Sequence, residues 1–107
     1  MIYTMEEIKR RITPIAKKYD LRAIYVFGSY ARNEATDNSD VDVLIDTKDS
    51  KIKGWIIGGL YDDLCEGLEK GTDLITLDAL TQDCENDRTP WFTENVMKEK
   101  VLLYGNQ

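Results

Sequence analysis

The chain has 107 residues, a formal net charge of −6 and no histidine. This length is typical of one domain, and we expect a single domain over residues 1–107. The acidic balance argues against direct nucleic-acid binding, because phosphate backbones are bound by clustered Lys and Arg. The lack of histidine excludes histidine metal ligands, histidine general bases and Ser-His-Asp catalysis.

The two cysteines, Cys65 and Cys84, have neither metal-ligand nor redox-motif spacing. We expect both to be reduced, as in a cytoplasmic protein. The sequence begins without a basic-then-apolar leader, and no apolar run approaches membrane-spanning length. These observations predict a cytoplasmic protein with no membrane partner.

The first predicted helix begins with a capping box, Thr4 to Glu7, and ends near Tyr19. Apolar side chains recur along one side at helical spacing. Pro14 lies inside the pattern and should kink the helix or remove one hydrogen bond. The basic residues of this helix lie on its polar side, which favours a solvated face.

A phosphate-binding turn is predicted after the first strand. Ala23–Phe27 is short, apolar and rich in β-branched and aromatic residues, which predicts a buried strand that Gly28 ends. Without a Cβ, Gly28 allows backbone N–H groups to approach a ligand, and Ser29 adds a hydroxyl donor. We expect Tyr30–Asn33 to form one helical turn, whose free N–H groups attract phosphate.

Two aspartates introduce the second predicted strand, Val41–Asp46. Side chains alternate along a strand, so Asp40 and Asp42 should share one face about 6.5–7 Å apart, with Val41 and Val43 on the other. Carboxylates at that separation can share or bracket Mg²⁺, which prefers oxygen ligands. The sequence therefore predicts a cation site beside the turn.

A long helix is predicted over Lys51–Leu68, where apolar residues recur every four positions. Gly54, Gly58 and Gly59 interrupt it, at about 1 kcal/mol each relative to alanine. They indicate either close packing on the sheet or a smooth surface for a partner.

A third carboxylate is expected on the next strand. Two-metal sites, with ions about 3.5–4 Å apart, generally use one. The best candidate is Asp73 within the apolar run Gly71–Leu77, with Asp46 and Asp78 as rivals. The alternative is that Gly28 is an ordinary turn and the aspartates are exposed charges, which leaves their common register unexplained.

The C-terminal segment contains one more predicted helix. Thr81–Arg88 is polar and loop-like, Pro90 fits the first position of a helix to about Lys100, and Val101–Tyr104 can form a last strand. Trp91-Phe92 belongs either to the core or to a docking surface.

The segment Gly28–Asp46 resembles the signature of the DNA-polymerase-β-like nucleotidyltransferases, and within them the minimal MNT-domain antitoxins. Thr72–Ile75 is similar to the family segment that carries the third catalytic carboxylate. The departure is Asn33, where the family commonly has glycine, but asparagine tolerates the left-handed conformation. Arg32 matches the family arginine and either contacts a phosphate or pairs with a surface carboxylate.

The resemblance implies an α/β fold, the polymerase-β-like nucleotidyltransferase fold, in which helices pack a small mixed sheet with the Gly28–Asp42 unit at the sheet edge. It also implies two groups of site residues: the catalytic and metal-binding carboxylates Asp40, Asp42 and Asp73, and the nucleotide-binding residues Gly28, Ser29 and Arg32.

The resemblance further implies a reaction and a partner. AMP would pass from Mg²⁺-bound ATP, with two ions, to a tyrosine hydroxyl of a HEPN-domain ribonuclease toxin, which is neutralised in a hetero-oligomer. One alternative is AMP transfer to an aminoglycoside-type antibiotic, although such enzymes usually have an added helical domain. The other is a non-catalytic antitoxin that masks its partner by binding, against which the intact carboxylate set argues.

Overall fold

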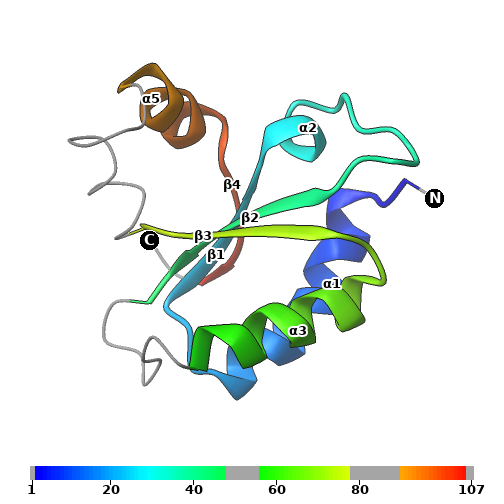
Figure 1. Ribbon diagram of the computed structural model, residues 1–107, viewed down its shortest axis with the longest axis vertical. Helices are drawn as coiled ribbons and strands as arrows, with labels where there is room; N and C mark the ends of the chain where they lie inside the picture. The colour runs from blue at the N-terminus through cyan, green and yellow to red at the C-terminus, as the bar shows by residue number, and fades with distance from the viewer. Residues whose placement is uncertain (1, 48–55, 78–89, 106–107) are drawn as a thin grey trace.

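The computed structural model describes residues 2–47, 56–77 and 90–105, and only the backbone of residues 90–93. Four strands form one sheet in the order β3-β2-β1-β4, with helices on both faces (Figure 1). The strands are β1 (Ala23–Phe27), β2 (Val41–Asp46), β3 (Thr72–Thr76) and β4 (Val101–Gly105). The helices are α1 (Met5–Lys18), α2 (Gly28–Ala31), α3 (Ile57–Leu68) and α5 (Pro90–Glu99). The predicted α/β class is confirmed.

The sheet is mixed, as predicted. β1 pairs antiparallel with both β2 and β4, whereas β2 and β3 are parallel and are joined through α3. The predicted last strand at Val101–Tyr104 is therefore confirmed as β4. The expectation that the Gly28–Asp42 unit lies at the sheet edge is wrong, because this unit connects β1 and β2, the two inner strands. All five residues of β1 are buried, as is typical of an inner strand covered on both faces.

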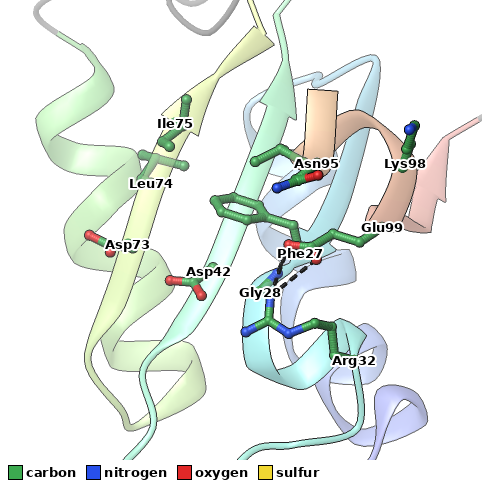
Figure 2. Close-up of a pocket in the computed structure, with 11 residues that line it drawn as sticks. Phe27, Gly28, Arg32, Asp42, Asp73, Leu74, Ile75, Asn95, Lys98 and Glu99 are labelled. Carbon is green, nitrogen blue, oxygen red and sulfur yellow. Dashed lines mark hydrogen bonds and ion pairs between the residues drawn. The ribbon is translucent and has the colours of Figure 1, made fainter. Parts of the chain in front are cut away.

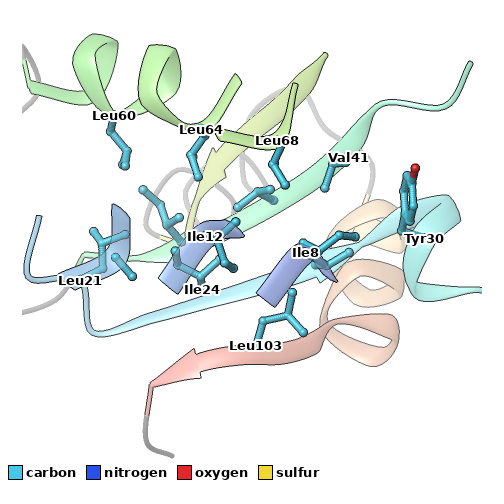
Figure 3. Close-up of a cluster of buried hydrophobic side chains, with 14 of the residues drawn as sticks. Ile8, Ile12, Leu21, Ile24, Tyr30, Val41, Leu60, Leu64, Leu68 and Leu103 are labelled. Carbon is cyan, nitrogen blue, oxygen red and sulfur yellow. The ribbon is translucent and has the colours of Figure 1, made fainter. Parts of the chain in front are cut away.

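The main hydrophobic core lies between the sheet and the layer formed by α1 and α3 (Figure 3). Leu60, Leu64 and Leu68 of α3 point towards Ile8 and Ile12 of α1 and are fully buried, as the helical periodicity of both segments requires. A smaller cluster on the other face of the sheet lies under α5 and consists of Ala23, Tyr25, Phe27, Leu44 and Val96. The two clusters together cover both faces of the inner strands.

Helix α1 begins and ends as predicted. The Thr4 Oγ1 accepts a hydrogen bond from the Glu7 N–H at 3.1 Å, and the helix ends at Lys18 with Tyr19 as its C-cap. The Glu7 carboxylate does not complete the capping box, because it is bonded to the guanidinium groups of Arg10 and Arg11. The helix continues through Pro14.

Gly58 and Gly59 of α3 do not pack against the sheet, so the interpretation that they allow close packing there is wrong. Gly58 and Gly59 are exposed; a Cβ on Gly58 would meet no atom within 4 Å, and one on Gly59 would face the Tyr19 hydroxyl of α1. The predictions for Gly54 and for the loop 81–88 lie outside the described residues. So do those for the side chains of Trp91 and Phe92.

Replacing Gly58 by alanine should stabilise the protein by roughly 0.4–1 kcal/mol, because the new methyl group meets open space and the unfolded chain loses freedom. Chemical denaturation measures the change. Gly67→Ala is the matched control in the same helix: its Cβ would lie 2.9 Å from the Ile15 Cδ1 atom, so its gain should be smaller. A destabilised Gly58→Ala variant would contradict the open surface at this position.

Candidate active site

Gly28 turns the chain from β1 into α2 in a conformation that other residues rarely adopt. Its φ is +74°, and a Cβ there would overlap the Asp42 carboxylate. The helical turn expected at Tyr30–Asn33 in fact begins at Gly28, immediately after the strand. Asn33 follows α2 with φ of 60°, which confirms the left-handed conformation expected of it.

Strand register brings the acidic residues to this turn. Phe27 lies opposite Asp42 in the antiparallel β1–β2 pair, and Asp42 lies opposite Asp73 in the parallel β2–β3 pair. Neighbouring strands are about 4.8 Å apart, so the two carboxylates share one end of the sheet face. Figure 2 shows them side by side, with the Gly28 turn next to Asp42.

An open pocket of about 940 Å³ lies over this end of the sheet, within the size range of small-molecule sites. Its walls come from β1, α2, β2, β3 and α5, and the lining residues are Phe27, Gly28, Arg32, Asp42, Asp73, Leu74, Ile75, Asn95, Val96, Lys98 and Glu99. Four of the six predicted site residues therefore line one pocket. Ser29 and Asp40 do not line it, and Asp40 is exposed beside Gly71.

Asp42 carries the strongest electrostatic perturbation in the pocket. Burial is the largest cause, and together with the charges of Asp73 and Asp40 it raises the pKa of Asp42 from 3.8 to about 6. Arg32 acts in the opposite direction but does not compensate. The carboxylates thus act on one another across the site, which leaves an excess of negative charge there.

The donor set fits a hard cation, although not an all-protein cage. Among the described residues, no three His, Cys, Asp or Glu side chains converge as a metal-ligand cluster. Mg²⁺ is commonly held by one or two carboxylates together with water and substrate phosphates, and the Asp42–Asp73 pair beside an open pocket matches that pattern. Of the rivals, Asp46 lies at the opposite end of β2 with Arg22, and Asp78 falls outside the described ranges.

Glu99 is a pocket residue that sequence reasoning missed. Its carboxylate accepts hydrogen bonds from the Gly28 N–H at 2.9 Å and from the Arg32 Nη1 at 3.0 and 3.2 Å (Figure 2). The Arg32 Nε donates to Glu34 at 2.7 Å, so Arg32 does pair with carboxylates, one of its two predicted roles. No local motif marks Glu99, because 71 positions separate it from Gly28.

The sequence matches the family model described as polymerase beta, nucleotidyltransferase, over residues 10–107. The chain belongs to this family. It is therefore a nucleotidyltransferase, as the resemblance implied. It is 38% identical over 101 residues to a Methanocaldococcus jannaschii protein with the provisional name protein adenylyltransferase MJ1379, which covers 94% of this chain and 93% of that protein.

Another relative is the protein adenylyltransferase MntA of Thermococcus cleftensis, 45% identical over 47 residues, covering 40% of this chain and 48% of that protein. Among solved structures, a chain of a toxin–antitoxin complex with AMP-PNP superimposes with a TM-score of 0.70 at 23% identity, covering 92% of this chain and 74% of that chain.

A complex of the MNT antitoxin with tri-AMPylated Shewanella oneidensis HEPN toxin also contains a similar chain, with a TM-score of 0.65 at 20% identity, covering 97% of this chain and 75% of that chain. These structural similarities support the fold. Within the described ranges, no helix is both long and apolar enough to cross a bilayer.

Replacing Asp42 by asparagine should stabilise the cation-free protein at neutral pH. The folded-state pKa of Asp42, about 6, lies above its ordinary 3.8, so wild-type stability falls as pH rises between these values and the full penalty remains above them. We expect a gain of about 1 kcal/mol, below the roughly 3 kcal/mol of a fully buried group, because water screens this half-buried side chain.

Urea unfolding in EDTA, at neutral pH and below pH 3.8, measures this gain. The difference in unfolding free energy between the variant and the wild type should shrink in acid, where Asp42 is protonated in both the folded and the unfolded wild-type protein. Asp46→Asn, at the other end of the same strand, is the control. A variant less stable than wild type at neutral pH would contradict the assigned repulsion.

Proposed function

We propose that this nucleotidyltransferase transfers AMP from Mg²⁺-bound ATP to a tyrosine hydroxyl of a HEPN-domain ribonuclease toxin and thereby neutralises it. The observation that carries the proposal is the pairing of Asp42 and Asp73 on adjacent strands next to the Gly28 turn, in one open pocket. Relatives named as protein adenylyltransferases, and a similar fold in a complex with an AMPylated toxin, support this substrate.

The polar groups around the turn are suited to a triphosphate. Gly28 has no Cβ and so leaves room for the Asp42 carboxylate, the Ser29 hydroxyl follows it at the start of α2, and Arg32 brings a guanidinium to the pocket. We assign the β- and γ-phosphates to this turn, because a helix start and a guanidinium both favour anions.

The carboxylates supply the other half of the chemistry. Asp42 and Asp73, with Asp40 close enough for its charge to act on Asp42, would hold the magnesium. When bound, the metal neutralises charge on the phosphates and on the leaving pyrophosphate.

In the transfer step, the tyrosine oxygen bonds to the α-phosphorus while the bond from that phosphorus to the bridging oxygen breaks. Pyrophosphate leaves with that bridging oxygen. The Asp73 carboxylate accepts the phenolic proton. Because ATP is the donor and Cys65 is a free thiol, we place the reaction in the cytoplasm.

Asp42→Asn should abolish AMP transfer while leaving the fold intact. The amide fills the same volume but cannot supply the negative charge that a divalent cation requires, so we expect a loss of at least about 10²-fold in rate. Transfer to the purified toxin is followed by mass spectrometry of the toxin. Asp46→Asn, on the same strand but away from the pocket, should transfer AMP normally; retained transfer by Asp42→Asn would overturn its assignment.

Neutralisation should be catalytic and dependent on ATP. A substoichiometric amount of the protein with Mg²⁺ and ATP should silence an excess of toxin, because each active site turns over. The toxin should remain inactive after the two proteins are separated, with its mass raised by whole AMP units. Titration of the toxin ribonuclease activity, with and without ATP, measures this.

The same titration separates the alternatives. Neutralisation that needs equimolar protein and ignores ATP would show masking by binding. Modification of an aminoglycoside in place of the toxin would show the antibiotic-modifying activity.

A further inference from the structure

The Glu99 carboxylate joins both ends of the short helix α2. At the start of α2 it accepts from the Gly28 N–H, and at the C-cap it accepts from the Arg32 guanidinium through both of its oxygens. The N-cap residue of α2 is Phe27, which has no side chain able to cap. Glu99 therefore provides from a distant element the acceptor that a helix start needs.

The contacts of Arg32 leave part of its guanidinium available. A guanidinium has five N–H donors, and in the described structure Nε bonds to Glu34 while Nη1 bonds to Glu99. Among the described residues none accepts a hydrogen bond from Nη2, so its two hydrogens can bind a ligand in the pocket that Arg32 lines. Held from two sides, the guanidinium cannot easily turn to pair with Asp42, where it would compete for a cation ligand.

The position of Glu99 within its own helix is electrostatically unfavourable. It is the last residue of α5, where the helix dipole favours a cation, and Lys98 precedes it. Its side chain is only 20% exposed and bonds to the Gly28 N–H and the Arg32 guanidinium. The contacts with Gly28 and Arg32 therefore explain why a carboxylate stands at the end of α5.

We propose that Glu99 is a positioning residue for the nucleotide phosphates: it holds the Gly28 turn and the Arg32 guanidinium in the orientation that phosphate binding requires. It acts through these two groups and does not touch the reacting atoms. This role rests on the proposed AMP transfer from ATP.

Glu99→Gln is the decisive variant. Its amide keeps the side-chain volume and one acceptor oxygen, but it loses the charge that pairs with Arg32. We expect the KM for ATP in toxin modification, and the calorimetric Kd for Mg²⁺-bound ATP, to rise about tenfold, as for loss of a charge-assisted hydrogen bond. The kcat at saturating ATP should stay within about twofold.

Three variants provide matched comparisons. Glu34→Gln loses only the more exposed contact with Arg32 and should raise the KM less than Glu99→Gln does. Glu94→Gln, also on α5 and paired with Lys98, should leave the KM unchanged. Glu99→Asp keeps the charge on a shorter stem, and its KM should lie between those of the wild type and Glu99→Gln, which also tests the role if Glu99→Gln does not fold.

An unchanged ATP affinity in Glu99→Gln, or a fall in kcat alone, would overturn the positioning role. A tighter affinity would overturn it too, because it would mean that Glu99 competes with phosphate for Gly28 and Arg32. Wild-type protein that binds no Mg²⁺-bound ATP would overturn the proposed function and this role together. Wild-type binding with no effect of Glu99→Gln overturns only the role.

Discussion

The register of β2 against its two neighbours determines where Asp42 and Asp73, the paired carboxylates of the site, lie. Val41 and Val43 are fully buried in the core with α1 and α3, so Asp42 between them must face the pocket. A slip by one residue would exchange the two faces. It would place a carboxylate among apolar side chains without a partner, which is strongly unfavourable. Core packing and site geometry are therefore a single constraint in this small protein.

The features that the sequence predicted are those with a local signal. The buried strand before Gly28, the alternation around Asp42 and the N-terminal cap at Thr4 each follow from neighbouring residues, and the structure contains all three. Asp73 could be predicted from a short apolar strand, but its position opposite Asp42 depends on the parallel crossover through α3. The resemblance supplied Asp73 as the third carboxylate of the site, and the structure adds its register opposite Asp42, which no local pattern encodes.

The predictions that failed depended on long-range packing. The strand order needed β4, a short tail, to pair with β1 and make β1 an inner strand. The exposure of Gly58 depended on which side of α3 faces the sheet. Helix α2 begins at Gly28, where the glycine adopts a positive φ beside Asp42 of β2, a residue 14 positions further along the chain. Glu99 was missed for the same reason, because it contacts Gly28 only when α5 packs against the turn.

The separation of Gly28 and Glu99 along the chain has a consequence for assembly during synthesis. β1, the turn and β2 lie within 24 consecutive residues, 23–46, and can pair soon after they leave the ribosome. Glu99 and β4 are made after β1, the turn and β2, and contacts between distant residues form slowly because a long loop must close. The nascent chain thus has the Gly28 turn before it has Glu99, the carboxylate that accepts a hydrogen bond from this turn. Under the proposed role of Glu99, the affinity for ATP therefore rises when α5 packs against the turn and β4 docks beside β1, so ATP affinity can report on this step of folding.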